Sequence, residues 1–460
     1  MNPIGKFARA DKAFLAASTL LALCYILSLL ILWPGVMSPD ASSQYAMAMS
    51  GVYTDHHPPL MSFVWRYLAQ IYPGPAPMFI LHISMLYLAT AIFLYMFRES
   101  RFKWWYAVYP LLPNLVAYTA LIVKDTGFTY TYLLSGAIMS YMVVTRTQKY
   151  KLPLLAAIIL LLFYGTAVKF QAKYILIFFT LGVSYCWANY KFNLKSVSGG
   201  IVLYMILMAA ITATNGKLVP IGKGSNSWQW VKVYDLSAIS IELDRPLYPD
   251  YILQQENFDF GKVKQLFRPS EVDPLVFETD AVIRRGKDEL QHQQLWDYWF
   301  ATIKQHPILY LQARARLFSY NLTTSPCERN NPVKFLRQTS LAAVLDIPGV
   351  GATLDAGYTI FKIAFRFMWI LPLVFLYLYL GIKNFRTSPA AAPLLLFCSS
   401  SLSLLVVLFF CSMAGTARYV FLSSCLMHAS HGMAFMVWRH KALSATPRIA
   451  KPPHLSIVNS

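Results

Sequence analysis

Three aspartates stand apart from the other acidic residues of the chain and could carry chemistry. Of the 21 acidic residues, sixteen fall in one long polar segment and two lie beside basic residues, which leaves Asp40, Asp55 and Asp125. A positioned carboxylate can act as a general base, and an ionisable group beside long apolar segments is costly unless it faces a cavity or a partner. We therefore predict one catalytic site. The alternative is structural: Asp40 could cap a helix after Ser38, and Asp125 could pair with Lys124.

A small set of cations accompanies these aspartates. Arg66, Lys124, Lys169, Lys173 and Arg418 lie in connections that otherwise carry little positive charge. Arg and Lys are the usual partners of phosphate groups, so Lys124, Lys169, Lys173 and Arg418 predict a phosphate-binding site. The alternative is that long basic side chains reach lipid headgroups at the membrane surface.

Further candidates for substrate binding adjoin these groups. Gln171 lies between two of the lysines, Tyr419 follows the arginine, and His56 and His57 open the stretch HHPPL. Two adjacent histidines point in different directions and no other cluster completes a ligand set, so a hydrogen-bonding role is favoured and no metal or other cofactor is predicted. The chain contains no Walker A motif, no Rossmann glycine fingerprint and no G-x-S-x-G motif.

The elements that must position these residues are apolar helices. The 460 residues are 57% hydrophobic and 13% charged, with a mean hydropathy of +0.45, whereas a soluble domain has about 25% charged residues. The chain also contains many apolar runs long enough to span a membrane. These runs exclude a nucleic-acid-binding protein and predict an all-α polytopic membrane protein. Taking about 20 apolar residues per crossing, we expect ten spans, near 13–34, 77–96, 104–122, 126–144, 153–168, 174–190, 198–214, 361–382, 390–411 and 417–437.

The basic residues predict an orientation for these spans. With ten spans, both termini lie on the same side of the membrane, and that side carries seventeen basic residues against two acids, Asp11 and Glu99. Cytoplasmic connections are rich in Lys and Arg. The formal net charge of +19 is thus mainly an orientation signal, and both termini are expected in the cytoplasm. The aspartates and their cations then lie on the periplasmic side of a bacterial inner membrane.

The spans divide the chain into three parts. Residues 1–214 form an N-terminal membrane module of about seven spans, whose outer loop 35–76 carries two short amphipathic helices. Residues 215–360 form an extracytoplasmic, mainly helical loop domain, and residues 361–460 add about three spans and a tail. The aromatic and basic stretch 295–322 is expected to be an amphipathic helix on the outer leaflet, with Pro307 breaking or starting a helix, or else to pack inside the loop domain.

This organisation resembles the GT-C superfamily of glycosyltransferases. In protein O-mannosyltransferases and the lipid A aminoarabinose transferase, the first outer loop has an acid, a tyrosine-bearing helix and a (H/K)PPL turn; here the counterparts are Asp40, Tyr45 and the turn 57–60. A second acid after span 3 is matched by Asp125, and the layout of seven spans, a large outer loop and further spans also agrees. The chain has a single Asp at position 40 where relatives have an acidic pair, which weakens a metal-dependent mechanism.

The resemblance implies an activity. Such enzymes move a sugar from a polyprenyl phosphate, of the undecaprenyl type in bacteria, to a glycan or glycolipid acceptor of the cell envelope, such as O-antigen or lipopolysaccharide. Asp40 would be the general base of an inverting reaction, with Asp55 or Asp125 orienting hydroxyl groups and Tyr45 contacting substrate. The alternatives are a polytopic transporter or flippase without transferase activity, which often has repeated halves, and an assembly factor whose loop domain binds partners.

Overall fold

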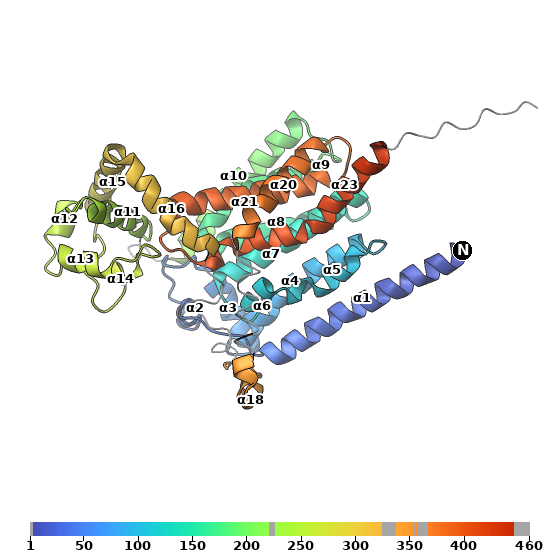
Figure 1. The fold of residues 1–460 in the computed structure, drawn as a ribbon, viewed down its shortest axis with the longest axis horizontal. Helices are drawn as coiled ribbons and strands as arrows, with labels where there is room; N and C mark the ends of the chain where they lie inside the picture. The colour runs from blue at the N-terminus through green and yellow to red at the C-terminus, as the bar shows by residue number, and fades with distance from the viewer. Residues whose placement is uncertain (1–2, 220–225, 324–336, 354–355, 357–366, 446–460) are drawn as a thin grey trace, which may run out of the picture.

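The computed structural model describes residues 3–219, 226–323, 337–353, 356 and 367–445, and in this part of the chain the fold is all-α (Figure 1). Five of the described helical segments are long and apolar enough to cross a membrane, which indicates a multi-pass membrane protein. These segments are Lys12–Leu32, Ala76–Met96, Leu194–Leu218, Ala391–Cys411 and Ala417–Arg439. They belong to α1 (Pro3–Leu32), α4 (Ala76–Met96), α10 (Leu194–Leu218), α21 (Ala391–Cys411) and the series η4 (Ala417–Val420), α22 (Phe421–Ala429) and α23 (His431–Ala445).

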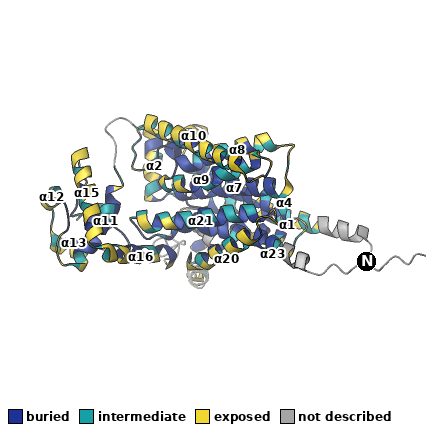
Figure 2. Cartoon of the chain, turned by 90° about the horizontal axis from the view of Figure 1, so that it is seen from above, coloured by how far each residue is buried: buried dark blue, intermediate teal, exposed yellow. Residues whose placement is uncertain are grey.

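Three further predicted spans are also continuous helices. They are α7 (Lys124–Thr145), α8 (Lys151–Ala167) and α9 (Lys173–Trp187). The core of the bundle forms around α7, which packs against α4, α8, α9 and α22 and is buried along nearly its whole length. The outer faces of α8 and α10 are exposed (Figure 2). Apolar side chains on such faces fit a lipid environment, because lipid tails are as apolar as the side chains themselves.

Two predicted spans differ from single helices. The stretch 104–122 is divided into α5 (Phe102–Val108), η1 (Tyr109–Leu111) and α6 (Pro113–Thr119). Prolines at 110 and 113 interrupt it, because proline cannot donate the backbone hydrogen bond of a helix interior. Of the stretch 361–382, residues 361–366 lie outside the described residues, and the remainder forms η3 (Phe367–Trp369) and all but the last residue of α20 (Ile370–Lys383).

The first long connection carries the two short helices that the sequence predicts, α2 (Pro39–Ser50) and α3 (Leu60–Ile71). The hydroxyl of Ser38 caps α2 by accepting from the backbone N–H of Ala41 at 3.2 Å. The helix ends at Gly51, whose φ of +70° is a left-handed conformation that glycine adopts without a steric penalty. Asp40 therefore lies in the first turn of α2 and is not its cap.

The chain between α10 and α20 contains a helical loop domain, which we define as residues 226–323. It comprises α11 (Gln229–Glu242), α12 (Asp250–Leu253), α13 (Phe260–Leu266), α14 (Asp273–Val276), α15 (Glu289–Gln305) and α16 (Pro307–Thr323), and it has its own hydrophobic core. Pro307 starts α16, one of the two predicted outcomes. The loop domain lies at one end of the helical bundle, next to α2 and α3, whereas the short α18 (Ala342–Leu345) lies near the end of α1 (Figure 1).

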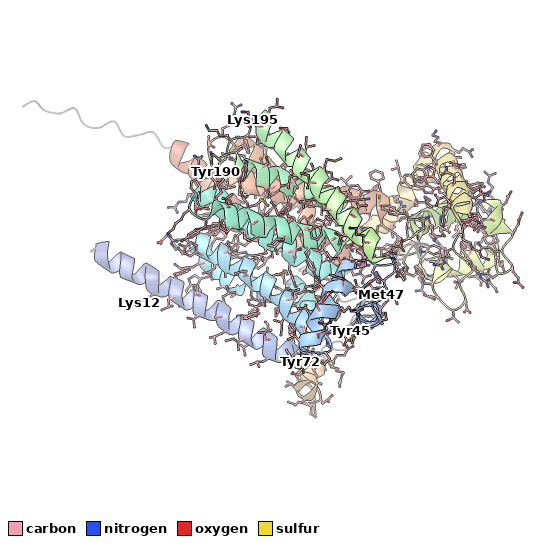
Figure 3. All side chains as sticks on the ribbon, turned by 180° about the vertical axis from the view of Figure 1, so that it is seen from behind. Lys12, Tyr45, Met47, Tyr72, Tyr190 and Lys195 are labelled. Atoms are coloured by element: carbon pink, nitrogen blue, oxygen red, sulfur yellow. The ribbon has the colours of Figure 1, made fainter. Side chains whose placement is uncertain are left out.

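The two ends of the bundle differ in charge. Figure 3 shows Lys12 and Lys195 at the end far from the loop domain, and Tyr45 and Tyr72 at the near end. The basic connections that follow α4, α7, α9 and α20 all lie at the far end, because each of these helices begins near the loop domain and runs away from it. The near end carries the three aspartates.

Candidate active site at the junction of the bundle and the loop domain

A cavity of about 450 Å³ lies where the near end of the bundle meets the loop domain. Its lining comes from many separate parts of the chain. These are the start of α2, the turn before α3, α6, the start of α7, the turn between α8 and α9, the segment between α21 and α22, and the loop domain. Eight of the residues predicted from the sequence line it: Asp40, His56, His57, Lys124, Lys169, Gln171, Arg418 and Tyr419.

A short backbone pairing positions Asp40 beside Lys124. The segment after α1 forms a parallel bridge between Val36 and Leu121. The N–H of Val36 donates to the carbonyl of Ala120 at 2.7 Å, and the N–H of Ile122 donates to the carbonyl of Val36 at 3.0 Å. Because the two bridged segments run in the same direction, α2 and α7, which follow them, begin side by side.

A second pairing holds the segment that precedes Arg418 against the loop domain. The N–H of Gly415 donates to the carbonyl of Ser270 at 2.6 Å, and the N–H of Val272 donates to the carbonyl of Met413 at 3.1 Å. A Cβ at Gly415 would lie 2.4 Å from the Cβ of Tyr320 and 2.8 Å from the carbonyl of Leu317, so only glycine fits this close approach.

Asp40 and Arg418 form an ion pair across this cavity. Nη1 of Arg418 lies 2.9 Å from Oδ2 of Asp40, and both side chains remain about one quarter exposed. Burial alone would raise the pKa of Asp40, but the positive charges of Arg418 and Lys124 together outweigh it and lower that pKa to about 2. The carboxylate is thus ionised at neutral pH and held by the guanidinium.

Lys124 has a neutral partner. Its Nζ lies 2.6 Å from Nδ1 of His57. Burial and the like charge of Lys169 lower the pKa of Lys124 to about 7, and in its charged form this lysine can only donate, which makes that ring nitrogen the acceptor. Burial and the nearby charge of Lys124 lower the pKa of His57 to about 2 and also lower the pKa of His56. Both imidazoles are therefore uncharged at neutral pH, and the rings lie 4.6 Å apart between centroids.

Asp125 lies behind the cavity wall and forms a buried ion pair with Lys169, which lines the cavity. Nζ of Lys169 lies 2.5 Å from Oδ1 of Asp125, with side-chain exposures of 6% and 3%. Burial lowers the pKa of Lys169, as does the charge of Arg418, whereas Asp125 opposes both effects. Lys169 and Arg418 both make cation–π contacts with the ring of Tyr419. Its centroid lies 4.6 Å from Nζ of Lys169 and 5.5 Å from the Arg418 guanidinium carbon.

Asp55 lines a neighbouring cavity of about 440 Å³. Gln171 and Tyr419 line both cavities, so the two spaces share a wall. Trp228 and His292 of the loop domain also line the second cavity. The three predicted aspartates therefore lie in one region, with Asp40 in the first cavity, Asp55 in the second and Asp125 behind the wall.

Besides Asp125, two predicted residues, Tyr45 and Lys173, line neither cavity. The hydroxyl of Tyr45 accepts from the N–H of Gly74 at 2.9 Å, and its ring packs against Trp65 with centroids 5.3 Å apart, so it joins α2 to the segment before α4. The ammonium of Lys173 lies over the rings of Tyr174 and Trp228, at 4.9 Å and 5.5 Å from their centroids.

The loop domain supplies cavity residues that the sequence reading missed. Asp273, at the start of α14, and Phe277 line the first cavity, as does Ser227. No sequence signal distinguishes this aspartate, because it is one of sixteen acids in a segment with equally many basic residues.

No family model matches the chain, and no curated protein or solved structure matches it.

Proposed function

We propose that the first cavity is the active site of a membrane glycosyltransferase of the GT-C type. It would take a sugar from a polyprenyl-phosphate donor and transfer it to a glycan or glycolipid acceptor at the periplasmic face of a bacterial inner membrane. The observation that carries the proposal is the meeting of Asp40, Lys124, Lys169 and Arg418, from distant parts of the sequence, in one cavity at one end of a membrane bundle.

The cations fit the leaving group of such a reaction. Sugar transfer from a lipid-linked phosphate breaks the bond between the anomeric carbon and the phosphate oxygen, and negative charge develops on that oxygen. Arg418 offers a planar group of N–H donors to it. Lys124, whose pKa of about 7 an adjacent phosphate would raise, adds a compact charge. Preorganised cations in a partly dry site stabilise such charge strongly. We assign Asp125 to positioning Lys169, because it binds that ammonium from behind.

Asp40 is the carboxylate best placed to act as the base. It would accept the proton of the acceptor hydroxyl as that oxygen attacks the anomeric carbon, and the configuration of the sugar would invert. In the free protein the carboxylate is held by Arg418, and its low pKa makes it a weak base. A donor phosphate would compete for Arg418, which frees Asp40 and raises its pKa when substrate is bound.

The decisive experiment uses the purified protein and radiolabelled undecaprenyl-phosphate hexoses. Asp40→Asn should remain folded but lose transfer or release of label by about 100- to 10,000-fold, the usual contribution of a general base. Asp280→Asn, an exposed position of the loop domain, is the matched control and should keep full turnover. Near wild-type turnover of Asp40→Asn would refute the assignment of the base.

The phosphate site has a separate test. Arg418→Ala should weaken binding of the same donors by about 10- to 150-fold, since a hydrogen bond to a charged group contributes about 1.5–3 kcal/mol. Unchanged donor affinity would remove Arg418 from the phosphate site. A protein that moves the labelled lipid between leaflets without releasing sugar from it would instead be a transporter.

A further inference from the structure

A second, chemically different groove lies at the other end of the bundle. It has a volume of about 540 Å³ and is enclosed by the ends of α7 and α9 and by the hairpin of α20 and α21. Its body is apolar, with Val143, Phe178, Leu181 and Leu396 among the lining residues. On α7 the groove is lined by Met139 and Val143, which follow Lys124 by 15 and 19 residues, so at 1.5 Å per residue the groove lies roughly 23–29 Å from the site cavity.

The mouth of the groove combines aromatic rings with positive charge. Phe192 and Phe385 come from two different connections and meet edge to face, with ring centroids 6.0 Å apart. Lys383 and Arg386 line the same groove, and both side chains are exposed. Aromatic and basic side chains are typical anchors at a membrane interface.

We propose that this groove binds one molecule of an anionic phospholipid, with an acyl chain in the apolar body and the phosphate headgroup at Lys383 and Arg386. Two features of the groove select this ligand. The apolar walls favour an alkyl chain over a soluble metabolite, and the paired cations favour a net negative headgroup over a zwitterionic one. Basic pockets between membrane helices are known to suit anionic headgroups. The site is separate from the active-site proposal, because it involves other residues at the opposite end of the bundle.

The test compares lipid retention by charge variants. Full-length protein in nanodiscs of equal phosphatidylglycerol and phosphatidylethanolamine is extracted into detergent, and the retained lipids are quantified by mass spectrometry. Each cation favours the anionic headgroup by about fivefold, so the pair favours it by up to about 25-fold. Lys383→Gln/Arg386→Gln should therefore lower the preference for phosphatidylglycerol by about tenfold or more.

The matched control removes two other positive charges from the same end of the bundle. Arg101→Gln/Lys195→Gln changes two exposed cations outside the groove and should keep the wild-type preference. Ala392→Phe, which fills the groove, should lower the retention of both lipids. Equal retention of the two lipids by the wild type, an equal loss in both double variants, or unchanged retention by Ala392→Phe would overturn the proposal.

Discussion

Arg314 forms a buried ion pair within the loop domain and also binds the segment that leads to Arg418, and its removal gives a quantitative prediction. Nη2 of Arg314 lies 2.6 Å from Oδ2 of Asp235, and both side chains are fully buried. Nη1 of Arg314 donates to the carbonyl of Ser412, and the indole N–H of Trp299 donates to the same carboxylate at 2.8 Å. Arg314 thus bridges α11, α16 and the chain just before residues 413–419, which line the cavity and which we call the cavity segment.

Replacing Arg314 by methionine keeps much of its volume and removes the charge. Asp235 would then be a buried carboxylate that keeps the indole N–H donor of Trp299, and the Ser412 carbonyl would lose its guanidinium donor. Breaking a buried ion pair costs about 3–5 kcal/mol, and leaving a buried carbonyl unsatisfied adds about 1–3 kcal/mol. We expect the free energy of unfolding of the loop domain to fall by about 4–8 kcal/mol.

The double variant Arg314→Met/Asp235→Leu separates charge from packing. Replacing both partners of a buried pair by apolar residues is often nearly neutral, so it should recover about 3 kcal/mol relative to the single variant. Urea unfolding of the detergent-solubilised protein, followed by tryptophan fluorescence, measures both. A loss below about 1 kcal/mol in Arg314→Met, or a double variant no more stable than the single one, would refute the reasoning.

Two further predictions concern the cavity wall. Asp125→Asn leaves the Lys169 ammonium buried without its carboxylate, so the free energy of unfolding should fall by about 3–5 kcal/mol; an unchanged thermal midpoint in detergent would contradict this. Gly415→Val places side-chain atoms against Tyr320 and the Leu317 carbonyl, so it should displace the cavity segment and lower transfer activity at least tenfold, whereas wild-type activity would contradict the tight contact.

Much of the fold follows from local sequence, because the length and apolar character of a helix are local properties. Composition and apolar runs predict an all-α membrane protein, and the described part of the chain has five helical segments long and apolar enough to cross a membrane. The predicted span 104–122 is wrong as a single helix. The stretch is apolar enough to be taken for one span, but the prolines at 110 and 113 divide it into three short helices.

The sequence predicts which residues belong to the candidate site but not which of them form ion pairs with one another. Charges that are unusual for their position marked Asp40, Lys169 and Arg418, and these residues meet in or at the cavity. The pairing did not follow, since the sequence suggested Lys124 as the partner of Asp125 and the structure gives Lys169. Such pairs depend on tertiary contacts between distant segments, which no local pattern encodes.

The pairing of Asp40 with Arg418 leads to a last prediction, on the pH dependence of transfer. A base loses activity as the pH falls through its pKa, and kcat/KM reports the free enzyme whereas kcat reports the substrate complex. In the free protein the pKa of Asp40 is about 2, so its protonation should not lower kcat/KM until the pH approaches that value. In the complex, a phosphate that takes Arg418 lets this pKa return toward about 3.9 or higher.

The acid limb of kcat should therefore lie at higher pH than that of kcat/KM. A difference of about two pKa units corresponds to about 2.7 kcal/mol, which is the interaction that the donor phosphate must replace at Arg418, and a charge-assisted bidentate contact is strong enough to do so. Steady-state kinetics across the acid range with a labelled donor measures both limbs. Coincident limbs, or a kcat limb at lower pH, would show that Asp40 keeps its guanidinium partner through the reaction and is not released by the donor.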